Sequence, residues 1–139
     1  MRAPLRTPIR TPLRTPLRTF AGSAVRRQID EDISADRLAA LVAATRTNGR
    51  PLLVDFFAEW CGPCKVLGPT IHKLAQSPAL VGGREFDLAT VDVDKNMDVA
   101  QIFKVRAMPT VVAVRDGAVV NQFVGVLPEP TLVEFIKSI

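Results

Sequence analysis

The sequence predicts an α/β domain with a central mixed sheet of four to five strands flanked by about four helices. Apolar segments of strand character alternate along the chain with segments whose apolar residues recur at helical spacing. Near the carboxyl end, two β-branched runs are separated by an Asp-Gly pair, which is typical of an antiparallel hairpin. The chain has 139 residues, 47% of them hydrophobic, which suits a single domain with its own core.

The amino-terminal segment differs from the rest, and we predict a leader at residues 1–24 that precedes a domain at residues 25–139. Residues 1–29 carry seven arginines and no acid, whereas the remaining residues carry 11 basic and 14 acidic side chains, so the formal charge changes from +7 to −3. Proline recurs at every fourth position as far as Pro16, which excludes a continuous helix there. An arginine-rich, acid-free start is typical of a mitochondrial transit peptide.

The leader therefore predicts import into the mitochondrial matrix, with a mature amino terminus near Ala21. The alternatives are an uncleaved basic arm on a cytoplasmic protein, or a tether to nucleic acid or anionic lipid, which needs more lysine and aromatic residues than this segment has. Apolar runs are far shorter than the ~18 residues of a membrane span. We expect neither nucleic acid nor a membrane as a partner.

The first part of the domain is predicted to contain a helix, a buried strand and a second helix. Ser34 is a favourable N-cap, and Gly49 follows the end of the first helix. Residues 51–58 read PLLVDFFA, an apolar run interrupted only by Asp55, which is typical of a central strand covered on both faces. Apolar residues at helical spacing over residues 66–75 predict the second helix.

The second part is predicted to contain a strand, a short helix, the hairpin and a closing helix. The strand covers residues 86–93, and the short helix covers residues 97–103 with Val99, Ile102 and Phe103 turned inward. The hairpin strands are residues 111–114 and 119–124. The closing helix presents one apolar face, made of Leu132, Phe135, Ile136 and Ile139.

Cys61 and Cys64 lie three residues apart where a strand passes into a helix, a spacing that permits a reversible disulfide. Unpaired N–H groups and the partial positive charge of the helix N-terminus favour a thiolate at Cys61 and lower its pKa. Pro63 fits the first helical turn, where its missing N–H would be unpaired anyway. The pattern predicts that Cys61 attacks a substrate disulfide and that Cys64 resolves the mixed disulfide.

Other uses of the cysteine pair are less consistent with the sequence. A structural zinc site needs two more ligands, and His72 is the only histidine. Covalent haem needs a histidine directly after the second cysteine, where Lys65 stands. A structural disulfide across so short a loop would constrain little of the unfolded chain. We therefore predict no metal site. We also interpret His72, Lys73, Asp92, Asp94 and Asp98 as solvated or helix-start residues.

Asp55 is the second candidate for chemistry. An ionised carboxylate inside an apolar strand is costly to bury without a partner or a task, so we expect its pKa to be raised. Alternation along the strand places it on the same side as Phe57 and Glu59, where it would lie below Cys64 and exchange a proton with it, directly or through water. The alternative is a carboxylate at the edge of the strand that caps a backbone group.

Three segments together resemble the thioredoxin family over roughly residues 25–139. They are residues 54–59 (VDFFAE), residues 60–65 (WCGPCK) and residues 108–110 (MPT). The resemblance implies the thioredoxin fold, with Cys61 as nucleophile, Cys64 as resolving thiol and Asp55 as buried proton acceptor. It also implies a cis peptide bond before Pro109 that turns the Met108 backbone toward the substrate.

By the same resemblance, a shallow apolar collar around Cys61 binds an extended substrate segment. Many relatives have a lysine near the buried aspartate, whereas Thr90 stands at the position that we align with it. Without that cation, burial would raise the pKa of Asp55 with less opposition. The collar residues implied are Trp60, Gly62, Pro63, Met108, Pro109, Gly125 and Val126.

The function that the resemblance implies is a thiol-disulfide oxidoreductase, a protein-disulfide reductase that contributes to cellular redox homeostasis with no bound cofactor. Its electrons would come from NADPH through a flavoenzyme thioredoxin reductase, and its substrates would be disulfide-containing proteins such as peroxiredoxins. We expect a monomer. Gly-Pro between the cysteines disfavours an oxidase or isomerase. The alternative from another class is a non-catalytic binding module with a thioredoxin-like fold.

Overall fold

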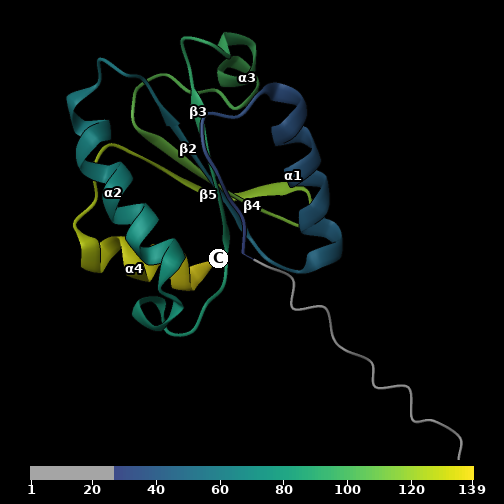
Figure 1. The fold of residues 1–139 in the computed structure, drawn as a ribbon, viewed down its shortest axis with the longest axis vertical. Helices are drawn as coiled ribbons and strands as arrows, with labels where there is room; N and C mark the ends of the chain where they lie inside the picture. The colour runs from purple at the N-terminus through teal and green to yellow at the C-terminus, as the bar shows by residue number, and fades with distance from the viewer. Residues whose placement is uncertain (1–26) are drawn as a thin grey trace, which may run out of the picture.

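The computed structural model describes residues 27–139. It contains a five-stranded mixed sheet with helices on both faces (Figure 1). The strands lie in the order β1-β3-β2-β4-β5 and comprise β1 (Ile29–Asp30), β2 (Leu52–Phe57), β3 (Asp87–Asp92), β4 (Thr110–Arg115) and β5 (Ala118–Val124). The predicted leader and the boundary after it lie outside the described residues, so both stay predictions.

The pairing of the strands places β2 at the centre of the sheet, as its apolar run predicts. β3 pairs in parallel with β1 and β2, whereas β4 is antiparallel to β2, and β5 is antiparallel to β4. In the parallel pair, Phe57 at the end of β2 lies opposite Asp92 at the end of β3. The segments that follow β2 and β3 therefore start next to each other, at the carboxyl ends of these two strands.

The helices divide into two layers (Figure 1). On one face lie α1 (Ala35–Asn48) and α3 (Met97–Ile102), and on the other lie α2 (Gly62–Gln76) and α4 (Glu129–Ser138), with a short 3-10 helix, η1 (Pro78–Val81), after α2. As predicted, Ser34 caps α1, because its side chain accepts a hydrogen bond from the Arg37 N–H. Gly49 ends α1 with φ at 68°, a left-handed conformation that glycine adopts without steric cost.

Two apolar clusters, one on each face of the sheet, form the core. Alternate residues of β2 enter opposite clusters: Leu52, Val54 and Phe56 pack beneath α1 and α3, whereas Leu53 packs beneath α2 and α4. The cluster beneath α2 and α4 includes Leu67, Ile71, Leu74, Leu88, Val111, Leu132 and Ile136, all at most 1% exposed. Asp55 belongs to the same side of β2 as Leu53, the side that α2 covers.

The hairpin forms as predicted, but α3 differs from the prediction in one residue. Asp116 and Gly117 form the turn between β4 and β5 with φ at 53° and 77°, as a two-residue hairpin turn of type I′ requires. Val99 is buried and the Phe103 ring lies 5.3 Å from the Phe56 ring, yet Ile102 is 75% exposed. The prediction that Ile102 faces inward is wrong, because Val99 and Phe103, four residues apart, occupy the inward side of this segment. Over residues 27–139, no helix is long and apolar enough to cross a membrane.

Candidate active site

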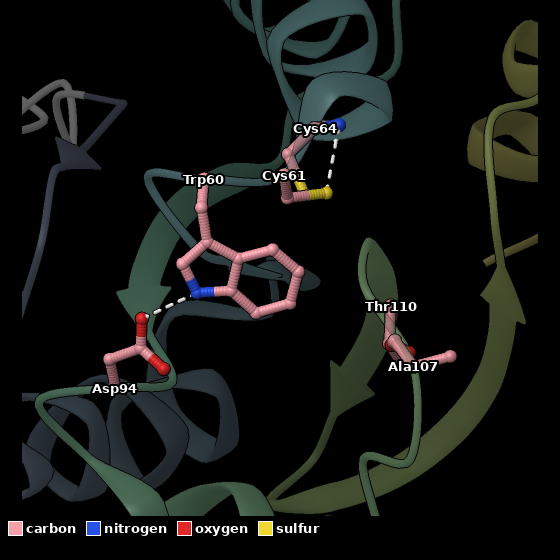
Figure 2. Close-up of a disulfide and its surroundings, with 6 residues drawn as sticks. All are labelled: Trp60, Cys61, Cys64, Asp94, Ala107 and Thr110. Atoms are coloured by element: carbon pink, nitrogen blue, oxygen red, sulfur yellow. Dashed lines mark hydrogen bonds between the residues drawn. A yellow bond between two sulfur atoms is a disulfide. The ribbon is translucent and has the colours of Figure 1, made fainter.

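The cysteine pair lies where β2 passes into α2. Cys61 is the N-cap of α2, with φ −82° and ψ 108°, and its N–H bonds the Ala58 carbonyl at 3.1 Å. Cys61 and Cys64 form a disulfide with their Cα atoms 5.4 Å apart. The Cys64 N–H donates to Cys61 Sγ at 3.2 Å (Figure 2). One of the unpaired donors of the helix N-terminus is thus directed at the sulfur that we predict to be the nucleophile.

This hydrogen bond gives the predicted thiolate a physical basis. In the reduced protein, a donor aimed at Cys61 Sγ stabilises the negatively charged form of the sulfur. Pro63 occupies the first turn of α2 and removes a donor only where the helix would leave it unpaired. The lowered pKa of the reduced Cys61 thiol stays a prediction, because the disulfide form does not titrate.

Both cysteines are largely covered, whereas their neighbours are exposed. Cys61 is 5% exposed and Cys64 is 7% exposed, but Trp60 is 68% exposed, and Gly62 and Pro63 also lie at the surface. The sulfurs are therefore reached over a narrow opening rather than from a broad surface. The exposure of Trp60 contradicts the role of an ordinary core aromatic and agrees with a place in the collar.

Trp60 is fixed by an aspartate from the turn that follows β3. Its Nε1 donates to Asp94 Oδ2 at 2.8 Å, and Figure 2 shows the indole nitrogen turned toward Asp94 and away from the disulfide. Asp94 in turn donates its N–H to Asp92 Oδ1 at 2.9 Å, and Asp92 is only 2% exposed. The interpretation of Asp92 as a solvated residue is wrong. Asp94 is exposed, as predicted, but its hydrogen bond with Trp60 was not predicted. The parallel pairing of β2 and β3 is the signal that brings these two strand ends together.

The second wall of the opening is the loop before β4. The Met108–Pro109 peptide bond is cis, as the family resemblance implies. The Thr110 hydroxyl donates to the Ala107 carbonyl at 2.6 Å across this loop. Met108 is half-buried and packs against the cluster that contains both cysteines. The loop is thereby packed against the same cluster as the cysteine pair.

The remaining collar residues follow β5. The Gly125 N–H donates to the Pro109 carbonyl at 2.8 Å, and Gly125 has φ at 89°, a conformation that disfavours residues with a side chain. Val126 is 41% exposed. The structure thus links this segment to the cis-proline loop. Binding of a substrate by the seven collar residues stays a prediction.

Asp55 is buried without a hydrogen bond at one of its oxygens. It is 3% exposed, and its Oδ1 has no partner among residues 27–139. Desolvation raises its pKa from 3.8 to about 7, which confirms the expected direction. The alternative of a capping carboxylate at the edge of the strand is wrong, because Asp55 lies inside β2 rather than at its end.

Asp55 and Cys64 line one open pocket of about 600 Å³. Thr90, the β3 residue opposite Asp55 in the parallel register, lines it too. The structure therefore brings together the buried acid, Cys64 and Thr90, and the alignment of Thr90 with the lysine of many relatives stays a prediction. Within the described part of the chain, no group of three or more His, Cys, Asp and Glu side chains is arranged to hold a metal ion.

The mixed sheet, the disulfide at a helix N-terminus and the cis-proline before β4 together define the class of proteins with a thioredoxin-like fold. The family model described as thioredoxin matches residues 33–138. The chain belongs to the thioredoxin family and has the thioredoxin fold.

Individual relatives agree with this assignment. The chain is 44% identical over 89 residues to the mitochondrial thioredoxin of Mus musculus, a match that covers 64% of this chain and 51% of that protein. The chain thus spans about half the length of this curated relative. Among solved structures, Fasciola hepatica thioredoxin has a TM-score of 0.68 at 38% identity, covering 78% of this chain and 97% of that one. A structure on thiol resolution in a yeast mitochondrial 1-Cys peroxiredoxin via glutathione and thioredoxin systems has a TM-score of 0.65 at 30% identity, covering 80% and 95%.

Proposed function

We propose that this protein is a thiol-disulfide oxidoreductase that reduces protein disulfides through Cys61 and Cys64. The observation that carries the proposal is the disulfide at the start of α2, where the Cys64 N–H donates to Cys61 Sγ at 3.2 Å. In a chain of the thioredoxin family, this arrangement supports Cys61 as the attacking sulfur.

The proposed reaction proceeds in two exchanges. The Cys61 thiolate attacks one sulfur of the substrate disulfide, so that the substrate S–S bond breaks, a mixed disulfide forms and one substrate thiolate leaves. Cys64 then loses its proton and attacks Cys61 Sγ, which releases the second substrate thiolate and closes the Cys61–Cys64 disulfide. Two electrons pass to the substrate, and the two thiolates take up two protons.

Asp55 is proposed as the acceptor of the Cys64 proton. It shares a pocket with Cys64, and burial raises its pKa to about 7. A group with a pKa near the operating pH both accepts and returns a proton readily. The unpartnered Oδ1 is thus consistent with a task rather than with a structural role.

The substrate surface is proposed to be the collar of seven residues. The exposed indole of Trp60, held by Asp94 at 2.8 Å, and the exposed Val126 offer apolar contacts on either side of the opening. The cis bond before Pro109 presents the Met108 backbone, with which an extended substrate segment would pair as an added strand. Such a surface selects for accessible disulfides more than for a particular sequence.

Membership of the family supports a proposal for the partners and the compartment. We propose reduction by an NADPH-dependent thioredoxin reductase, no bound cofactor, and action as a monomer in the mitochondrial matrix. The mitochondrial relative in Mus musculus supports the compartment, and the neighbour from the yeast peroxiredoxin study supports peroxiredoxins as substrates. A mature amino terminus near Ala21 on protein isolated from mitochondria is the expected result. An intact Met1 on the cellular protein contradicts the leader hypothesis.

The decisive test is reduction of insulin disulfides by the wild-type protein and by Cys61→Ser, with dithiothreitol as the electron donor. The wild type is expected to accelerate insulin reduction, and Cys61→Ser is expected to leave only the background rate, because the attacking sulfur is gone. Cys64→Ser is expected to accumulate the mixed disulfide on Cys61, which mass spectrometry detects. Equal rates for the wild type and Cys61→Ser contradict the proposal and favour the non-catalytic binding module.

A further inference from the structure

One face of α2 leads from the resolving cysteine to the single histidine of the chain. Cys64, Gly68 and His72 are spaced four residues apart, which places them along one side of a helix, and all three line the pocket that contains Asp55. A Cβ atom added at Gly68 would meet no heavy atom within 4 Å. The missing side chain at Gly68 therefore leaves an open hollow between Cys64 and His72.

The floor of this hollow is the buried acid. Asp55 and Thr90 line it from β2 and β3, and Asp55 is 3% exposed with Oδ1 unpartnered within the described part of the chain. A proton that Asp55 accepts must reach bulk solvent, or return from it, by way of this pocket. The other charged residues that line this pocket are Glu31 and Asp32 after β1, Glu59 after β2 and Lys65 on α2.

Among these lining groups, His72 is the one whose chemistry suits proton transfer near neutral pH. Its side chain is 24% exposed, so it lies between the pocket and solvent, and its Nδ1 is 3.6 Å from Glu31 Oε1. Asp32 is held by Lys95. Thus Glu31 is the carboxylate that the structure pairs with the imidazole.

We propose that His72 is a positioning residue that carries protons between Asp55 and bulk solvent along the hollow left by Gly68. This inference rests on the proposed function, because it assigns a route to the proton that Cys64 gives up when it resolves the mixed disulfide. Water in the pocket passes the proton from Asp55 to His72, and His72 releases it at its solvent-exposed side, which restores the ionised carboxylate. No electrons move in this step, and no bond between heavy atoms changes.

The test measures the resolution step in His72→Gln, with Lys73→Gln as the matched control on the neighbouring, solvent-facing position of α2. Reduced protein is mixed with excess insulin at low buffer concentration, and disulfide closure is followed by the fluorescence of Trp60, the only tryptophan. We expect resolution to be about threefold to tenfold slower in His72→Gln, less than the ~10²-fold that a direct base supplies. Free imidazole at about 0.1 M is expected to restore the rate, whereas Lys73→Gln behaves like the wild type.

A second pair of variants tests the hollow itself. Gly68→Leu is expected to fill it and to slow resolution as His72→Gln does, whereas Gly68→Ala leaves most of it open and keeps the wild-type rate. A wild-type rate in His72→Gln at low buffer overturns the proposal, and so does a slow rate that imidazole does not restore. In both cases the wild type still reduces insulin, so failure of this proposal is distinct from failure of the proposed function.

Discussion

Two aspartates on neighbouring strands are buried to the same degree but have opposite surroundings. Asp87 at the start of β3 is 4% exposed and pairs with the Arg50 guanidinium at 3.1 Å. It also accepts the Gln28 N–H at 2.9 Å and the Asn48 side-chain amide at 3.4 Å. Asp55 on β2 is 3% exposed, and its Oδ1 has no such partner in residues 27–139.

The difference shows that burial alone does not define the role of a carboxylate. The partners of Asp87 come from the segment before β1, the end of α1 and the loop before β2, so this carboxylate joins three parts of the fold. Asp55 bears the cost of desolvation without compensation at Oδ1, which raises its pKa to about 7 and makes its proton exchangeable at neutral pH. Asp87 therefore stabilises the fold. Burial of Asp55 destabilises the fold at neutral pH but gives this carboxyl the pKa that proton exchange needs.

The largest expected effect is on stability at Asp87. Asp87→Ala removes the carboxylate that pairs with Arg50, whose side chain is 10% exposed, and breaking a buried ion pair costs about 3–5 kcal/mol. Urea unfolding at pH 7 measures the loss. The rate of insulin reduction by the folded variant is expected to equal that of the wild type. A loss of less than ~1 kcal/mol, or a specific loss of activity, removes the distinction between the two aspartates.

Asp55→Asn is expected to change stability in the opposite direction, depending on pH. The pKa of Asp55 rises from 3.8 to about 7 in the folded protein, so between these values the unfolded chain releases a proton that the folded chain retains. The unfolding free energy of the wild type is therefore highest, as far as Asp55 is concerned, below pH ~4. It falls as the pH rises to ~7 and is constant above that pH. Asp55→Asn lacks this loss, so at pH 8 it is expected to be more stable by up to about 4 kcal/mol.

Urea unfolding of Asp55→Asn and the wild type at pH 4.5 and pH 8 checks this expectation, since the difference between them should grow with pH. The same variant is expected to resolve the mixed disulfide about 10²-fold more slowly, because it cannot accept the Cys64 proton. A pH-independent difference in stability would mean that Asp55 is already ionised in the folded protein at low pH.

The two aspartates also differ in how much of their surroundings could be predicted from the sequence. A charged residue inside the run PLLVDFFA is itself a signal, so the burial of Asp55 and its raised pKa could be predicted. Asp87 also lies in a predicted strand, but its partners come from three separate segments, and no local pattern indicates them. The β1 strand has two residues, too few to show any period.

The site itself divides in the same way. The roles proposed for Cys61 and Cys64 follow from their spacing and from the start of α2, which is local information. The hydrogen bond between Trp60 and Asp94 at 2.8 Å forms because β2 and β3 end side by side. It could be predicted only by someone who already knew that these two strands pair in parallel. Side chains whose role depends on tertiary contacts are therefore the ones that sequence analysis missed.

The smallest expected effect concerns Asp94, a third aspartate, which is exposed and hydrogen-bonded. Asp94→Ala removes the acceptor of the Trp60 indole, and because both groups lie at the surface, the loss of stability is expected to be about 0.5–1 kcal/mol. Insulin reduction is expected to show a KM about two- to fivefold higher with kcat unchanged, since the indole is no longer fixed beside the disulfide. Asp98→Ala, at an exposed aspartate of α3, is the control. An unchanged KM would place Trp60 outside the substrate surface, and a loss of stability as large as that of Asp87→Ala would show that exposure does not separate these aspartates.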